Sequence, residues 1–175
     1  MVEFHPLIKV LGDPILKNKA KEVDCLDDSF FKLCLEMQRL MHEADGIGIA
    51  ANQVGSDLAV FITRAEGKDD IVINPEILEM SDKLETFQEG CLSIPGVFCN
   101  SHNRFNKIKV RYRSSDNINE VVERELCGIP AVVFQHETDH LNGKLYIDHY
   151  GPLARSMALQ KHKKYMKNLN KKPIG

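Results

Sequence analysis

The segment AVVFQHETDHLNG, residues 131–143, constrains the fold more than any other part of the chain. Pro130 suits the first turn of a helix and Gly143 suits its end, so the segment predicts a helix. The first half of the segment is apolar, which predicts that the helix lies buried in the middle of the protein. His136 and His140 are four residues apart and therefore share one face of that helix. Two buried imidazoles need a reason, and a shared metal ion is one.

Glu137 completes the pattern HExxH, in which two neutral imidazoles bind a metal and the adjacent carboxylate acts as general base toward a water that the metal activates. Two alternatives stay open at this point. The histidines are solvent-facing residues of an ordinary helix, or they belong to a structural zinc site. A structural zinc takes four protein ligands and needs no adjacent base, so Glu137 favours a catalytic site.

A third metal ligand has to come from upstream of this helix. Tyr146 stands where the longer HExxHxxGxxH pattern has a histidine, and no carboxylate follows Asp148. Cys91 in FQEGCLSIPG is the strongest candidate, because Gly90 permits close approach of the backbone and a turn follows. The other cysteines differ: Cys25, Cys34 and Cys127 are expected to be small core residues, and the role of Cys99 stays open.

Length and composition set the class of protein. With 175 residues, 43% of them hydrophobic, the chain is long enough to form one domain, residues 1–175, with its own buried core. It has no apolar stretch near the roughly 18 residues of a membrane span, and its start, MVEFHPLIKV, does not resemble a signal peptide. Five scattered cysteines, an odd number, fit a reducing compartment. We therefore expect a cytoplasmic protein that does not bind membranes.

Charge is unevenly distributed along the chain, although the formal net charge is only −2. All 25 Asp and Glu precede His149, and seven of the 23 Lys and Arg follow it. These seven are Arg155, Lys161, Lys163, Lys164, Lys167, Lys171 and Lys172. A basic C-terminus on an acidic body suggests a polyanionic partner, while a solvated charged face is the commoner alternative.

Hydrophobic patterns predict the remaining elements. Residues 28–44 form an amphipathic helix that starts at the capping types Asp28 and Ser29. A C-terminal helix covers about 152–170, with Leu153, Met157, Leu159 and Met166 on one side. Four β-rich runs lie at 58–63, 70–78, 107–113 and 119–127, and the last two are placed to form a hairpin. The sequence therefore predicts an α+β fold of mostly antiparallel strands packed around a central HExxH-bearing helix, with an N-terminal and a C-terminal helix.

Three stretches together resemble the signature motifs of the peptide deformylase family. They are GIGIAANQ at 46–53, EGCLS at 89–93 and QHETDH at 135–140, in the order in which that family has them. VLGDPILKNKAKEV near the start, INPEI at 73–77 and IKVRY at 108–112 are also similar to the family. The resemblance covers nearly the whole chain and is to the bacterial type with a C-terminal helix.

This resemblance implies an enzyme that removes the formyl group from the N-terminal formylmethionine of newly made polypeptides and releases formate. It implies a metal held by Cys91, His136 and His140, with Fe²⁺ as the native ion. The same ligands suit Zn²⁺, Ni²⁺ or Co²⁺, any of which is expected to occupy the site in purified protein.

The resemblance also assigns catalytic roles. Glu137 accepts a proton from the attacking water and delivers it to the leaving amine. The side-chain amide of Gln53 and the backbone N–H of Leu92 donate to the oxyanion that develops on the formyl group.

Substrate-binding residues are expected on both sides of the metal. Ile47 and Gly48 form a strand-like edge for the peptide, and Gly90 lets the main chain come close. Val132 and Val133 share the face of His136 and, with Phe87, wall a pocket for the methionine side chain. Ile129 lies on the same face, but a place in the core is at least as good an interpretation for it.

Residues 96–103, GVFCNSHN, depart from the family pattern, which often has an arginine there. Peptide contacts on that side are therefore open. Arg104 does match a family arginine, and we expect it to pair with Glu89 and so fix the strand that positions Cys91; an exposed surface arginine is the alternative.

The basic C-terminal helix resembles the last helix of the bacterial type, which docks on the ribosome, so ribosomal RNA is the expected polyanion. We expect a monomer that binds neither DNA nor membranes. Two other functions stay open: an HExxH metallopeptidase that takes a third ligand other than Cys91, and a non-catalytic relative that binds RNA or the ribosome.

Overall fold

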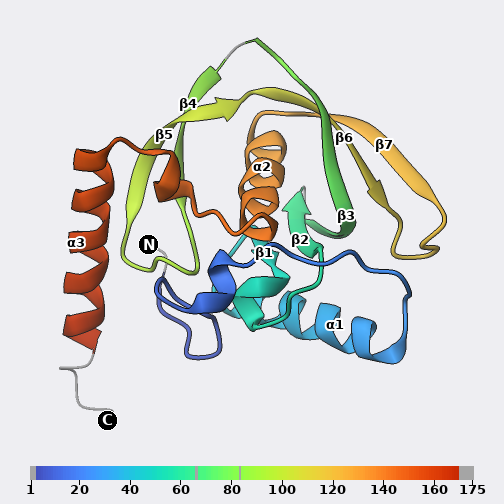
Figure 1. Ribbon diagram of the computed structural model, residues 1–175, viewed down its shortest axis with the longest axis horizontal. Helices are drawn as coiled ribbons and strands as arrows, with labels where there is room; N and C mark the ends of the chain where they lie inside the picture. The colour runs from blue at the N-terminus through green and yellow to red at the C-terminus, as the bar shows by residue number, and fades with distance from the viewer. Residues whose placement is uncertain (1–2, 66, 83, 170–175) are drawn as a thin grey trace.

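The computed structural model describes residues 3–65, 67–82 and 84–169 (Figure 1). Its α-helices are α1 (Asp28–Glu43), α2 (Ile129–Leu141) and α3 (Pro152–Leu169), and 3₁₀ helices lie at Pro14–Lys17 (η1), Ala51–Val54 (η2) and Tyr146–His149 (η3). One sheet has the order β1-β2-β3-β6-β7, formed by Gly48–Ala50, Val60–Ala65, Lys68–Met80, Lys107–Arg113 and Val121–Cys127. A second sheet pairs β4 (Leu84–Gly90) with β5 (Phe98–Phe105). All these pairings are antiparallel, which confirms the predicted fold class.

Helix α2 runs through the middle of the molecule, with strands around it (Figure 1). Gly128 precedes it at φ +64°, a conformation that glycine adopts without strain, and Pro130 lies in the first turn. Nine of the 13 residues of α2 are buried, including both histidines. A helix that is apolar around most of its circumference has to lie inside the protein, so the predicted central position is confirmed.

Helix α1 packs against β1 and β2 (Figure 1). The side chain of Asp27 caps it by accepting a hydrogen bond from the Phe30 N–H, so the helix starts one residue after this cap rather than at a cap formed by Asp28 or Ser29. Its buried residues are Phe30, Cys34, Met37, Leu40 and Met41, which recur with helical spacing and form one apolar face. This face closes the core beneath β1.

The hairpin of β4 and β5 is absent from the predicted strands. Both strands consist mainly of polar residues that are exposed or half-buried, and apolar residues are few, so the sequence contains no hydrophobic run that would predict them. The predicted hairpin of residues 107–113 and 119–127 is present as β6 and β7, with Lys107 paired to Cys127.

Helix α3 lies at one edge of the molecule, beyond the β4–β5 hairpin (Figure 1). Ala158 and His162 are its buried residues. Leu153 and Met157 are exposed, whereas Leu159 and Met166 are half-buried, so the expectation that these four residues share one side is wrong. Two further expectations are also wrong, because Cys25 and Cys127 are exposed; Cys34 is buried as expected. Lys171 and Lys172 lie outside the described residues. Within the described residues, no helix is long and apolar enough to span a membrane.

Candidate metal centre

Cys91, His136 and His140 come together in the interior. Helix α2 presents both imidazoles on one face with ring centroids 5.2 Å apart, and Cys91 directly follows β4. Cys91 Sγ lies 3.1 Å from His140 Nε2, and one ligand atom of each residue lies within 4.8 Å of the others. Atoms that share a tetrahedral metal lie roughly 3–4 Å apart, since metal bonds to nitrogen and sulfur are about 2.0–2.3 Å long. The spacing is therefore close to what one shared ion requires.

The donor set fits a catalytic metal rather than a structural one. In the described part of the chain, no fourth His, Cys, Asp or Glu joins the group. A structural zinc needs four protein ligands, so that alternative is wrong here. Both histidines are buried, which also excludes solvent-facing histidines. A tetrahedral ion held by two imidazoles and one cysteine sulfur would have one position left for a reactant.

The turn after β4 carries Cys91 into the interior. The Ile94 N–H donates to the Cys91 carbonyl at 2.9 Å and so closes this turn, and the Leu11 N–H donates to the Ser93 carbonyl at 2.8 Å. Ile94 and Val97 belong to an apolar cluster with Cys91 itself. Packing and hydrogen bonds thus hold the thiol in place from two sides.

A chain of charged residues orients His136. Glu89 Oε2 lies 2.9 Å from His136 Nδ1, which assigns the hydrogen to Nδ1 and leaves Nε2 free to bind a metal. Arg104 donates to Glu89 through Nε and Nη2, both at 3.0 Å, and through Nη1 to Asp139 Oδ2 at 2.6 Å. Asp139 Oδ2 also lies 2.7 Å from His149 Nε2. The predicted contact between Glu89 and Arg104 is therefore present, and Arg104 is buried rather than a surface residue.

Protonation states in this centre follow from burial and charge. Burial alone raises the pKa of Glu89, but the hydrogen bonds from His136 and Arg104 outweigh it and lower that pKa to about 2. Burial also lowers the pKa of His140 well below its usual value, which keeps this imidazole neutral as a ligand must be.

Glu137 lies beside the metal ligands, and unlike Glu89 its carboxyl group has a raised pKa. Burial raises the pKa of its carboxyl to about 7. Its Oε2 is buried without a hydrogen-bond partner among the described residues. A carboxyl group with a pKa near neutral pH and a free oxygen is suited to accept and release a proton.

Gln53 and Leu92 place two donors near Cys91. Gln53 Oε1 accepts from the Ala50 N–H at 2.9 Å, which turns its amide nitrogen toward the site. Gln53 Nε2 donates to Ser93 Oγ at 3.1 Å and lies 3.8 Å from Cys91 Sγ. One of its two hydrogens is therefore held by Ser93, and the second points to the metal ligands. Leu92, next to Cys91, is buried and borders the same space.

A cavity of about 390 Å³ opens onto these groups. It is in the range of pockets that hold one small ligand. The residues predicted to bind substrate all line it, namely Ile47, Gly48, Phe87, Gly90, Val132 and Val133. Ile129 lines it too and is exposed, so the interpretation of Ile129 as a core residue is wrong.

A steric constraint that the sequence did not reveal explains why position 48 is a glycine. A Cβ built at Gly48 would collide with Glu137 Oε1 and would come within 2.9 Å of Val133 Cγ1. The absence of a side chain at this position is what lets the Glu137 carboxyl occupy its place beside β1.

Sequence reasoning missed several residues that support the site. Asn52 Nδ2 donates to the His140 carbonyl at 2.6 Å, Ser93 holds Gln53, and Asp139 with His149 extends the ion pairs of Arg104. Asn52, Ser93 and Asp139 lie inside the three motifs, so their position was the available signal. No such signal marks His149.

The fold and the site define a metal-dependent hydrolase, with an HExxH helix at its centre and a cysteine that would serve as third metal ligand. Comparison with known proteins then gives the family. The family model described as polypeptide deformylase matches residues 6–156. The chain belongs to the peptide deformylase family.

Individual relatives agree with this assignment. A peptide deformylase from Thermotoga sp. (strain RQ2) is 44% identical over 154 residues, which cover 88% of this chain and 92% of that protein. The crystal structure of a peptide deformylase from Legionella pneumophila superimposes with a TM-score of 0.89 at 34% identity, covering 95% of this chain and 98% of the other. One from Synechococcus elongatus, in complex with actinonin, has a TM-score of 0.84 at 36% identity, covering 90% and 88%.

Proposed function

We propose that this chain hydrolyses the formyl group from the N-terminal formylmethionine of newly made polypeptides and releases formate. Family membership makes the chain an enzyme of this class and decides against the HExxH metallopeptidase and the non-catalytic relative. The observation that carries the proposal is the buried group of Cys91, His136 and His140, with Glu137 beside it, at a cavity. Residues 1–175 act as one catalytic domain.

Cys91, His136 and His140 hold a divalent metal, and Fe²⁺ is the native ion. Such an ion, when bound, activates water for attack and polarises the formyl carbonyl. The thiolate and imidazole ligands also suit Zn²⁺, Ni²⁺ and Co²⁺, so the ion found in purified protein depends on supply.

Residues around the cavity perform the proton transfer and the charge stabilisation. Glu137 takes a proton from water as the oxygen bonds to the formyl carbon, and gives it to the nitrogen as the C–N bond breaks. Formate and the free amine of methionine are the products. Gln53 Nε2 and the Leu92 N–H donate to the oxyanion, and losing one such donor costs roughly 3 kcal/mol of barrier.

The cavity fits the end of a peptide. Val132, Val133 and Phe87 receive the methionine side chain, whereas Ile47, Gly48 and Gly90 border the peptide backbone. Glu89 and Arg104 take no part in the bond changes and act by holding His136 in orientation.

The substrate sets the place of action. Formylated chains emerge from ribosomes in the cytoplasm, where we expect this enzyme to work as a monomer. Helix α3 exposes Lys161, Lys163, Lys164 and Lys167 and has no acidic residue, which favours contact with ribosomal RNA.

The test is formate release from formyl-Met-Ala-Ser by protein purified without oxygen and reconstituted separately with Fe²⁺, Ni²⁺ or Zn²⁺. We expect rapid release that is abolished in Cys91→Ala and in Glu137→Ala. Cys34→Ala, a buried cysteine away from the site, is the matched control and is expected to retain activity. Glu137→Ala should still bind metal, which separates loss of the base from loss of the ion. A Glu137→Ala enzyme with full activity would contradict the mechanism.

A further inference from the structure

Two carboxylates beside the metal ligands share one guanidinium. Arg104 lies 3.0 Å from Glu89 and 2.6 Å from Asp139, and the side chains of Arg104 and Glu89 are almost fully buried. The two carboxylates carry one negative charge more than Arg104 neutralises. Charges taken out of water are stabilised only when further hydrogen bonds satisfy them, so a second donor to this group stabilises it.

His149 supplies the second donor. Its Nε2 lies 2.7 Å from Asp139 Oδ2, the same oxygen that accepts a hydrogen bond from Arg104 Nη1. A hydrogen bond to an ionised acceptor is roughly twice as strong as one between neutral groups. Two donors that meet at one oxygen therefore fix the carboxylate of Asp139 against the guanidinium of Arg104.

The strand that carries Arg104 also holds the backbone of His149. Asn103 precedes Arg104 in β5, and its Nδ2 donates to the His149 carbonyl at 2.8 Å. His149 is the last residue of the 3₁₀ helix η3, and its side chain is 30% exposed. Strand β5 and helix η3 together thus place a partly exposed imidazole against Asp139.

Hydrogen bonds connect this imidazole to a metal ligand. The contacts from His149 through Asp139, Arg104 and Glu89 to His136 are each 2.6–3.0 Å long. The guanidinium is planar and presents its donors in a fixed fork. A rotation that moves Nη1 relative to Asp139 therefore also moves Nε and Nη2 relative to Glu89, which orients His136.

From this geometry we infer that His149 is a positioning residue of the metal centre and that its hydrogen bond to Asp139 raises the affinity for the metal. The inference rests on the proposed metal site. Because His149 acts through three intermediate side chains, we expect an effect of about fivefold, smaller than the roughly 10–100-fold of residues that contact a ligand directly.

The experiment measures Ni²⁺ affinity by competition with a chelator, together with urea unfolding of the metal-free protein. His149→Leu removes the donor and should lower the affinity by about fivefold. His149→Gln puts an amide N–H close to the place of Nε2 and should restore the affinity to within about twofold of native. His5→Leu removes another contact of a histidine with a carboxylate, that of His5 with Glu43, and is the matched control. It should leave the affinity unchanged.

Asp139→Asn tests the route of the effect. If His149 acts through Asp139, adding His149→Leu to Asp139→Asn should cause no further loss of affinity. A second loss of the same size in the double variant would overturn the inference. Native affinity in His149→Leu, with only its unfolding free energy lowered, would show a merely structural role and overturn it as well, as would a His149→Gln protein as weak as His149→Leu. A native protein that binds no Ni²⁺ would instead contradict the proposed metal site.

Discussion

Arg104 neutralises the carboxylates of Glu89 and Asp139 in the interior. Replacing it by methionine would leave the buried carboxylate of Glu89 without its guanidinium and would remove one of the two partners of the half-buried Asp139. Breaking a buried pair costs roughly 3–5 kcal/mol. The orientation of His136 depends on Glu89, and removal of such a supporting interaction lowers metal affinity about 10–100-fold. We therefore expect Arg104→Met to lower both the free energy of unfolding and the affinity for the metal.

Urea unfolding measures the first quantity for Arg104→Met, and competition with a chelator for Ni²⁺ measures the second. Arg64→Met removes an exposed arginine and serves as control. Metal affinity within twofold of the native protein would show that Arg104 does not act on the metal ligands.

Gly48 is the second residue with a defined steric role. An alanine there has to displace Glu137 Oε1 and Val133 Cγ1. Because a shift of about 1 Å in a catalytic group can cost about 100-fold in rate, we expect Gly48→Ala to lower kcat by roughly that factor. Gly151→Ala is the control, since nothing lies within 4 Å of the added Cβ.

The readout for Gly48→Ala is steady-state formate release together with bound metal per chain. The metal content should stay unchanged, because the collision is with the base and not with a ligand. A kcat equal to that of the Gly151→Ala enzyme would show that Glu137 moves without penalty.

At the scale of elements, a surface ion pair joins η3 to η1. Asp148 Oδ2 lies 2.7 Å from Lys17 Nζ and accepts from the Leu145 N–H at 3.0 Å. Partial burial raises the pKa of Asp148, but these two hydrogen bonds outweigh it and lower that pKa below its usual value. A lowered folded-state pKa contributes stability that is complete above the unfolded value of about 3.9 and disappears as pH falls through the folded pKa.

Asp148→Asn should therefore lower the free energy of unfolding by about 0.5–1 kcal/mol at pH 7, since the pair is partly exposed. The difference from the native protein should shrink below about pH 4, because the native carboxyl then takes up a proton. Urea titrations at pH 7 and pH 3 measure this, with Asp24→Asn as control. A difference that grows on acidification would contradict the assignment.

Some elements of the fold could be predicted from the sequence and others could not. Helix α2 was predictable because its apolar start, Pro130 and the spaced histidines all indicate one buried helix. The β4–β5 hairpin was not, because its strands are mainly polar and are stabilised by pairing with each other rather than by burial of an apolar face. Strand β1 has only three residues, too few for a periodic pattern.

The residues of the site can likewise be divided into those that the sequence predicted and those that it did not. The metal ligands, Glu137 and Glu89 lie in the motifs, and Arg104 matches an arginine of the family, so the sequence was enough to name them. His149 and the collision at Gly48 arise from chain segments that meet only in the fold, and no local pattern encodes such a meeting.

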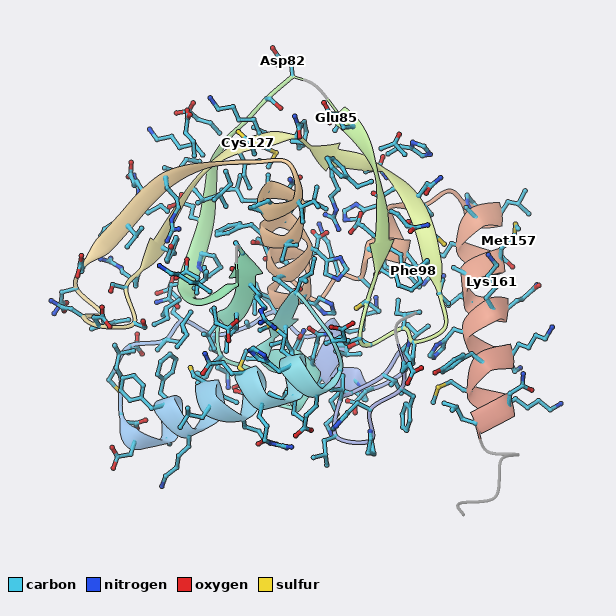
Figure 2. All side chains as sticks on the ribbon, turned by 180° about the vertical axis from the view of Figure 1, so that it is seen from behind. Asp82, Glu85, Phe98, Cys127, Met157 and Lys161 are labelled. Atoms are coloured by element: carbon cyan, nitrogen blue, oxygen red, sulfur yellow. The ribbon has the colours of Figure 1, made fainter. Side chains whose placement is uncertain are left out.

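On the scale of the whole molecule, α3 is attached to the site by one face. His162 Nδ1 donates to the Pro95 carbonyl at 3.1 Å, and the ring of Tyr165 packs against Gly96, in the segment that follows Cys91. The other face carries Met157 and Lys161, which Figure 2 labels on α3. Deleting α3 would therefore disturb the metal centre as well as any docking surface, so only substitutions on the exposed face separate the two.

Charge reversal on that face tests ribosome binding. Lys161→Glu with Lys164→Glu changes two exposed residues one helical turn apart and leaves His162 and Tyr165 in place. If α3 binds ribosomal RNA, ribosome affinity should fall, and the slope of log affinity against log salt should lessen by about 0.7–0.9 for each phosphate that the helix no longer neutralises. Formate release from formyl-Met-Ala-Ser should not change, because neither lysine lines the cavity.

The control for this test is the double variant Lys32→Glu with Lys68→Glu, which changes the net charge by the same amount at sites outside α3 and should leave ribosome affinity closer to native. An equal decrease in both double variants would assign the effect to net charge, and no decrease in the α3 variant would exclude this helix as the docking surface.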